Sequence, residues 1–98
     1  MRIHVVQSGG LAGLRREHDL DTDALPEDAR LSLTRLVQGV AFFGLSSARV
    51  SNLPDMIQYR VRIEEGDRAH EVTFDDGIDD TSLLELVELV TELAKARR

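Results

Sequence analysis

Carboxylates are the residues of this chain whose spacing points most directly to chemistry. Asp19, Asp21 and Asp23 alternate along one short stretch, and oxygen donors at alternate positions open the calcium-binding loop of an EF-hand. The sharp-turn glycine of that loop would fall at Ala24 and its bidentate glutamate at Arg30, so the match fails. Two alternatives remain: a polar loop beside a helix cap, or a loop that presents a carboxylate to a cation of a partner.

The histidines are the next candidates for metal or acid–base chemistry. If the first two predicted strands form a hairpin, His4 and His18 lie on the same sheet and, with Asp19, have the composition of a metal or acid–base site. Exposed strand histidines without such a role are the alternative. His70 alternates with apolar residues, so we expect it to pack in or near the core.

Motifs of enzymes are missing from the sequence. The glycine-rich stretch 9–13 has no Gly-Lys-Ser/Thr sequence and precedes a charged, strand-like segment, so it is neither a phosphate-binding nor a dinucleotide-binding loop. The chain has no cysteine, which removes disulfides, thiolate catalysis and cysteine-ligated zinc. A second acidic group, at 75–80, has the composition of a turn followed by a helix cap. We therefore expect neither enzymatic activity nor a cofactor.

Apolar residues in a loop provide a different kind of candidate. Val50, Leu53 and Met56 stand among serine, asparagine and proline without a regular period. They either fold back onto the core or form an apolar patch for recognition. An apolar loop beside a carboxylate-bearing loop would make a two-part binding surface.

Hydrophobic periodicity predicts the elements that position these residues. Alternation predicts strands, and apolar residues at i, i+3, i+4 and i+7 predict amphipathic helices. An antiparallel sheet with both helices on one face buries the apolar sides of all these elements. The expected fold is α+β with the order ββαββα, a four-stranded, mainly antiparallel sheet and one domain over residues 1–98. The expected elements are strands at about 2–8, 14–20, 57–64 and 70–74 and helices at about 27–41 and 81–97.

Size and charge exclude several classes of protein. The chain has 98 residues and a formal net charge of −6, and this acidic balance argues against binding to nucleic acid or to an anionic membrane surface. No apolar run approaches the ~20 residues that a membrane span needs. The first residues lack the apolar stretch of a secretory signal, so we expect a cytoplasmic protein.

The sequence resembles the emfourin-like protein inhibitors over nearly its whole length. Each shared motif is short, and the combination carries the resemblance, together with chain size and element order. The motifs are the opening Met1-Arg2-Ile3-His4-Val5-Val6-Gln7-Ser8-Gly9-Gly10 with Leu11-Ala12-Gly13, then Phe42-Phe43-Gly44-Leu45, Asp55 before the Tyr59 strand, His70-Glu71-Val72-Thr73-Phe74-Asp75-Asp76 and a leucine-rich last helix.

The resemblance implies a function and a set of contact residues. Emfourin inhibits bacterial zinc metalloproteases of the thermolysin (M4) family, chiefly protealysin-like ones, and in that family two neighbouring loops are thought to bind the protease. One loop supplies an aspartate to the catalytic zinc and the other supplies apolar side chains to the substrate pockets. Carried over to this chain, the zinc ligand is expected at Asp23, then Asp21. Apolar contacts are expected from Leu25 beside it and from Val50, Leu53 and Met56.

Other functions remain open at this point. The alternative to an inhibitor is an interaction module that uses the apolar loop on a partner that is not a protease. Ser8, Gly9 and Gly10 either border the binding surface or serve only as turn residues.

Overall fold

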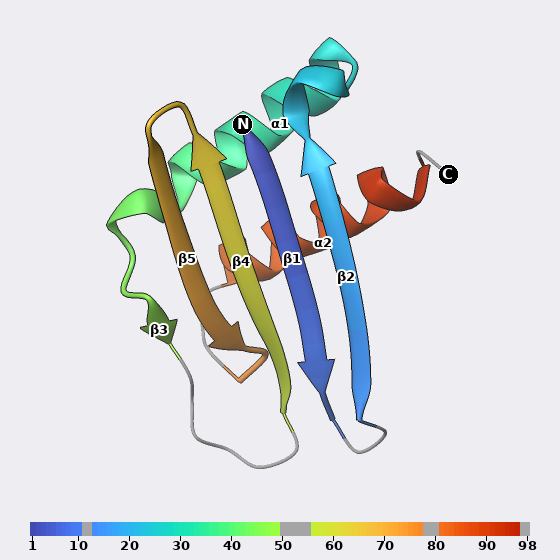
Figure 1. Cartoon of the computed structure of the whole chain (residues 1–98), viewed down its shortest axis with the longest axis vertical. Helices are drawn as coiled ribbons and strands as arrows, with labels where there is room; N and C mark the ends of the chain where they lie inside the picture. Colours follow the sequence, from blue (N-terminus) through green and yellow to red (C-terminus); the bar gives the residue numbers. More distant parts are fainter. Residues whose placement is uncertain (11–12, 50–55, 78–80, 97–98) are drawn as a thin grey trace.

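A five-stranded sheet forms the frame of the molecule. The computed structural model describes residues 1–10, 13–49, 56–77 and 81–96. The strands β1 (Arg2–Gly9), β2 (Leu14–Asp21), β4 (Ile57–Glu65) and β5 (Arg68–Asp75) each run antiparallel to their neighbours among these four, and the sheet order is β2-β1-β4-β5-β3 (Figure 1). The α+β class and the ββαββα order are confirmed.

The fifth strand lies inside the stretch 46–55, which the sequence predicted as a loop. β3 comprises only Ala48–Arg49 and runs parallel to β5, and the Thr73 amide donates a hydrogen bond to the Ser47 carbonyl at 2.8 Å. Two residues are too few for any periodicity to appear in a sequence. The added strand is therefore a feature that only the tertiary structure reveals.

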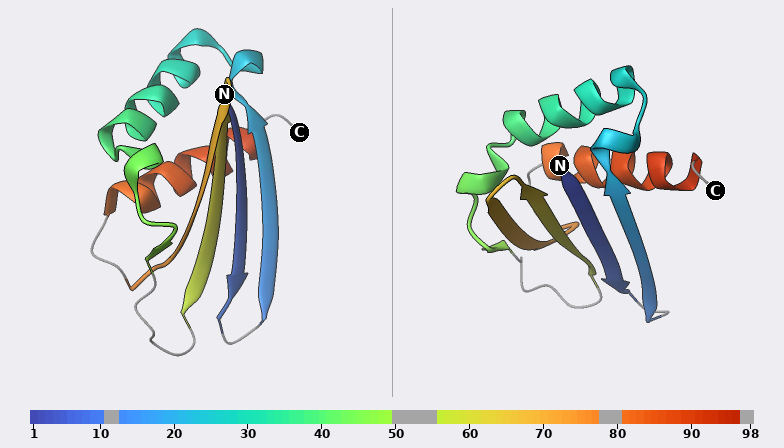
Figure 2. Two further views of the ribbon diagram at one scale, coloured as in Figure 1. Left: turned by 60° about the vertical axis from the view of Figure 1, so that its left-hand side comes forward. Right: turned by 45° about the horizontal axis from the view of Figure 1, so that its top comes forward.

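Both helices cover one face of the sheet, as predicted. Helix α1 is Glu27–Gly39 and helix α2 is Thr81–Ala96, and they lie together on the same side of the strands (Figure 2). The core between the helices and the sheet contains the inward-facing residues of every long strand. Its fully buried side chains are Ile3, Val5, Leu20, Leu33, Phe42, Val61, Ile63, Val72, Phe74, Leu83, Leu86 and Val90.

The end of α1 differs from the expectation of a helix to residue 41, after which a glycine such as Gly44 would be the usual cap. The helix ends at Gly39, and Ala41 adopts the left-handed conformation with φ 52° that terminates many helices. Gly44 instead belongs to the short 3₁₀ helix η2, Phe42–Gly44. An alanine in this conformation has no sequence signature, because glycine or asparagine is the usual residue there.

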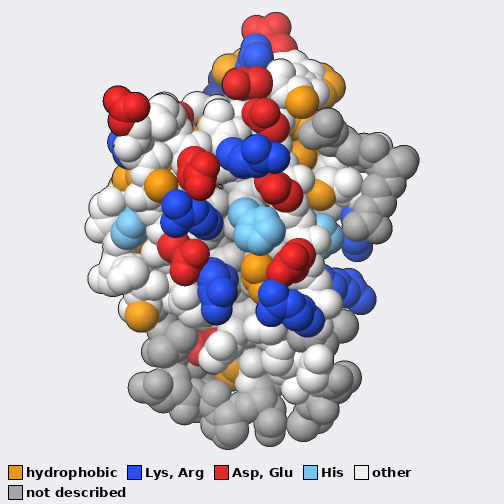
Figure 3. Space-filling view, viewed as in Figure 1, with side chains coloured by type: hydrophobic (Ala, Val, Ile, Leu, Met, Phe, Trp, Pro, Cys, Tyr) orange, Lys and Arg blue, Asp and Glu red, His pale blue; other side chains and the backbone are white. Residues whose placement is uncertain are grey.

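The other face of the sheet carries a mosaic of alternating charges. Acidic and basic side chains alternate around a histidine on this face (Figure 3). Arg2 pairs with Asp19 at 3.2 Å and Arg62 pairs with Glu64 at 3.1 Å, and all four side chains are about half exposed or more. Exposed pairs of this kind contribute little stability. This face is therefore a solvent-exposed surface on which acidic and basic side chains pair with each other.

Candidate functional site

One end of the sheet brings several connections together. Gly9, the last residue of β1, lies between Leu14 of β2 and Ile57 of β4. Asp75, the last residue of β5, pairs with Gln58 of β4. The connections after β1, before β4 and after β5 therefore all leave from this end, which we call the Gly9 end (Figure 1).

The backbone at the Gly9 end is closely packed. Gly9 has φ +98°, and a Cβ atom added to it would lie 2.9 Å from the carbonyl oxygen of Met56. The amide of Asp76 donates a hydrogen bond to the carbonyl of Ile57 at 3.2 Å. Met56 itself is half-buried. Backbone contacts thus hold together the end of β1, the start of β4 and the residue after β5. Met56, a predicted apolar contact residue, lies at this point.

The predicted zinc-binding aspartates lie elsewhere. Asp21 caps the 3₁₀ helix η1 (Thr22–Ala24), and its Oδ1 accepts a hydrogen bond from the Asp23 amide at 3.0 Å. The Asp23 side chain is exposed, and within the described part of the chain no hydrogen bond or ion pair engages its carboxylate. Asp23 is therefore available to a partner, whereas Asp21 already has a structural task.

The carboxylate stretch and Met56, the one predicted apolar loop residue that the structure describes, are not neighbours, which corrects that part of the sequence interpretation. Asp21 lies opposite Arg2 at the start of β1, and Met56 lies beside Gly9 at its end. β1 has eight residues, and at about 3.3 Å per residue its two ends are roughly 23 Å apart. The cause is the hairpin itself, because β2 runs back along β1 and delivers Asp21 to the opposite end.

Leu25 occupies the core rather than the surface. Its side chain is 7% exposed and packs in the main hydrophobic cluster. Its amide donates to the Thr22 carbonyl at 3.1 Å, so η1 and the start of α1 hold it in place. The expectation that Leu25 enters a pocket of a partner does not agree with this burial. Val50 and Leu53 lie outside the described residues.

Asp76 is an exposed carboxylate at the Gly9 end that the sequence interpretation assigned only to a turn. The turn exists, since the buried Asp75 accepts a hydrogen bond from the Gly77 amide at 3.0 Å. Asp76 also acts on its surroundings: burial raises the pKa of Tyr59, and the negative charges of Asp76 and Glu88 raise it further. The sequence could have located Asp76 in one way. Because β5 is antiparallel to β4, the residue directly after β5 must lie near the start of β4, beside Met56.

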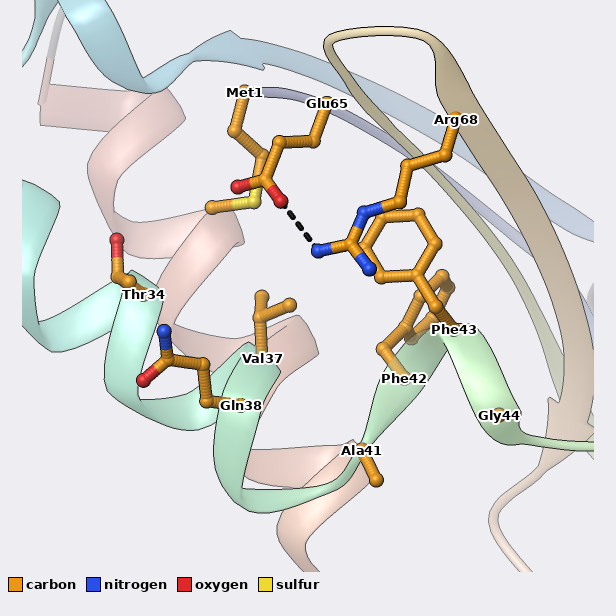
Figure 4. Close-up of a pocket in the computed structure, with 10 residues that line it drawn as sticks. All are labelled: Met1, Thr34, Val37, Gln38, Ala41, Phe42, Phe43, Gly44, Glu65 and Arg68. Atoms are coloured by element: carbon orange, nitrogen blue, oxygen red, sulfur yellow. Dashed lines mark hydrogen bonds and ion pairs between the residues drawn. The ribbon is translucent and has the colours of Figure 1, made fainter.

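An apolar hollow lies away from the Gly9 end, between α1, η2 and the β4–β5 hairpin. Its volume is about 320 Å³, and Met1, Val37, Phe42 and Phe43 supply apolar lining (Figure 4). The Arg68 guanidinium lies 3.9 Å from the Phe43 ring centre and forms an ion pair with Glu65 at 2.6 Å. These contacts tie η2 to the hairpin, and the two charges on the rim satisfy each other.

Comparison with known proteins decides the family. Residues 5–91 match the sequence profile of the Emfourin family. The chain belongs to the Emfourin family. No curated protein sequence and no solved structure matches it. Membership is consistent with a protease-inhibitor role, and the matched region runs from within β1 to within α2 and contains every element between them.

The histidines do not form a joint site in this Emfourin domain. His4 lies opposite Asp19 on the charged face, whereas His18 lies opposite Val5 and is 7% exposed on the helix side. Neighbouring positions in a hairpin alternate between faces, so the proposed cluster of His4, His18 and Asp19 is wrong. Across the described ranges, no three potential metal ligands come together.

The third histidine has a structural role in the Emfourin domain. His70 is half-buried, its Nε2 lies 2.7 Å from the Leu45 carbonyl oxygen, and its ring packs edge-on against Phe42. The expectation that His70 packs near the core is confirmed.

Within the described residues, no helix is long and apolar enough to cross a membrane.

Proposed function

We propose that this Emfourin domain inhibits zinc metalloproteases of the thermolysin family, with a protealysin-like enzyme as the target class. The observation that carries the proposal is the family match over residues 5–91. The physical mechanism is simple. A catalytic zinc keeps one coordination position open for water or substrate, and a carboxylate of an inhibitor that occupies it displaces the water that attacks the peptide bond.

The Gly9 end is the proposed contact surface. An inhibitor that uses two neighbouring segments needs two connections that leave the fold side by side, and the packing of Gly9 against Met56 supports this arrangement. Met56, together with Val50 and Leu53 from the preceding segment, would fill apolar substrate pockets. Burial of an apolar side chain in such a pocket contributes roughly 1.5–3 kcal/mol, which is enough to orient the domain.

Two positions compete for the role of zinc ligand. Asp23 is the choice from the sequence, and its unengaged, exposed carboxylate supports it. Asp76 is the choice favoured by location, because its amide is bonded to Ile57, next to Met56. Asp55 lies outside the described residues and is included in the test because it directly precedes Met56 in the sequence. We favour an aspartate next to Met56 at the Gly9 end, Asp76 or Asp55, over Asp23 as the zinc ligand.

The test is a titration of a purified protealysin-like protease with the domain and three isosteric variants. Asp76→Asn or Asp55→Asn is expected to weaken inhibition at least tenfold, about 1.4 kcal/mol, while Asp23→Asn leaves it unchanged. Asparagine keeps the shape and removes the charge, and the midpoint of urea unfolding controls for loss of structure. The reverse pattern assigns the ligand to Asp23. If all three variants inhibit like the parent chain, no aspartate of this set binds the zinc.

A further inference from the structure

Gly9 lies where two backbones approach each other closely at the proposed contact surface. An added Cβ would stand 2.9 Å from the Met56 carbonyl oxygen and 3.8 Å from the Gln58 amide nitrogen. A Cβ atom does not come this close to a carbonyl oxygen unless one of the two shifts. Because the obstructing atom belongs to the backbone, it cannot swing aside as the tip of a long side chain does.

The segment that carries Met56 is held on both sides. Ile57 pairs with Gly9 in β1, and its carbonyl accepts the hydrogen bond from the Asp76 amide at 3.2 Å. Displacement of the Met56 carbonyl away from Gly9 therefore strains the neighbouring ladder and the link to the segment after β5. Met56 has little room to retreat.

We infer that Gly9 is a positioning residue for partner binding. Its missing side chain lets β1 pass against Met56 and so fixes two segments, the end of β1 and the start of β4, relative to each other. The inference rests on the proposed function, since it assigns these two segments to one contact surface. A side chain at this position separates the two segments, and the partner then meets a surface of different shape.

Other glycines of the chain provide matched controls. Gly13, in the connection after β1, has φ +62°, and Gly66, in the β4–β5 turn at the opposite end, has φ +60°. An alanine at any of the three positions is strained by the positive φ. An added Cβ meets no atom within 4 Å at Gly13 or at Gly66. The collision with Met56 is therefore specific to Gly9, whereas the strain is shared.

The first experiment needs no protease. The sequence contains two methionines, Met1 and Met56, so methyl-¹³C methionine labelling gives two assignable NMR signals, one near each end of β1. Gly9→Ala is expected to shift the Met56 signal and to leave Met1 in place, while Gly13→Ala and Gly66→Ala leave Met56 in place. An unmoved Met56 signal in folded Gly9→Ala overturns the inference. If Gly9→Ala does not fold alone, the comparison is made in chains that also carry Ala41→Gly, a change expected to stabilise the fold because Ala41 has a positive φ of 52°.

The second experiment measures inhibition of the protealysin-like protease by the same variants. Gly9→Ala is expected to raise the inhibition constant at least tenfold more than Gly13→Ala or Gly66→Ala does. Equal inhibition by all three variants overturns the role in partner binding. The proposed function is contradicted if the unmutated chain does not inhibit the protease and its Met56 signal does not change when protease is added. This result is independent of the Met56 shift caused by Gly9→Ala, so the two proposals can fail separately.

Discussion

At the scale of single residues, Ala41 is the position where the backbone and the side chain disagree. Its φ of 52° is the only positive value at a non-glycine residue in the described part of the chain, and an L-residue in this conformation is destabilised by roughly 1–2 kcal/mol. Ala41→Gly removes the strain at the end of α1. We expect the free energy of unfolding to rise by about 1 kcal/mol, measured by urea denaturation.

The matched control is Ala69→Gly, an exposed alanine in β5 with an ordinary backbone conformation. There glycine only adds freedom to the unfolded chain, so we expect a loss of roughly 0.5–1 kcal/mol. Opposite signs for the two substitutions identify the left-handed conformation as the cause. A loss of stability in both variants would show that Ala41 is not strained.

At the scale of elements, Leu25 lies between η1 and α1, and its side chain is buried in the core. Leu25→Ala leaves a cavity in the core and is expected to lower the free energy of unfolding by about 2–4 kcal/mol. Leu31 lies nearby in α1 and is 45% exposed. Leu31→Ala should therefore change the free energy of unfolding by less than about 0.5 kcal/mol. Urea denaturation of both variants makes the comparison.

Inhibition separates the two roles that Leu25 has been given. If Leu25 only packs the core, folded Leu25→Ala protein inhibits a protealysin-like protease as well as the parent chain does. A loss of inhibition at protein concentrations corrected for the unfolded fraction would restore Leu25 to the contact surface.

The elements themselves were largely predictable, because each is determined by a local pattern. Alternation in 57–64 located β4 within a residue, and the apolar stripe of the last helix located α2 in the same way. The position of Asp21 was also accessible: a hairpin of β1 and β2 requires Asp21 to lie beside Arg2, away from the connection before β4. Leu25 was not accessible, because a single apolar residue before a proline is compatible with burial and with exposure.

At the scale of the whole molecule, the chain has a net charge of −6. Acidic and basic groups neutralise each other on the open face of the sheet, as in the pairs of Arg2 with Asp19 and of Arg62 with Glu64. Around Tyr59, by contrast, Asp76 and Glu88 act on the phenol with the same sign. Negative charge therefore acts on Tyr59, which lies opposite Gln7 of β1 near the Gly9 end.

Tyr59 is the only tyrosine of the chain and reports on this local field. Burial first, then Asp76 and Glu88, raise its pKa above the ordinary value of 10.0. The folded state therefore keeps the phenol proton at pH values where the unfolded chain has released it. Between these two pKa values the folded state binds more protons, so the stability that Tyr59 contributes is complete below about pH 10 and falls as the pH rises further.

Ultraviolet titration of tyrosinate measures this pKa directly in the folded protein. Asp76→Asn and Glu88→Gln are each expected to lower it, and about 1 M salt should lower it in the parent chain, because the Debye length there is about 3 Å. Glu27→Gln, at the start of α1, makes the same change of net charge and should leave the pKa in place. Since burial is the larger cause, a raised value should persist in both variants and in salt. A pKa that returns to the ordinary value on removal of Asp76 alone would show that charge, not burial, dominates at this end of the sheet.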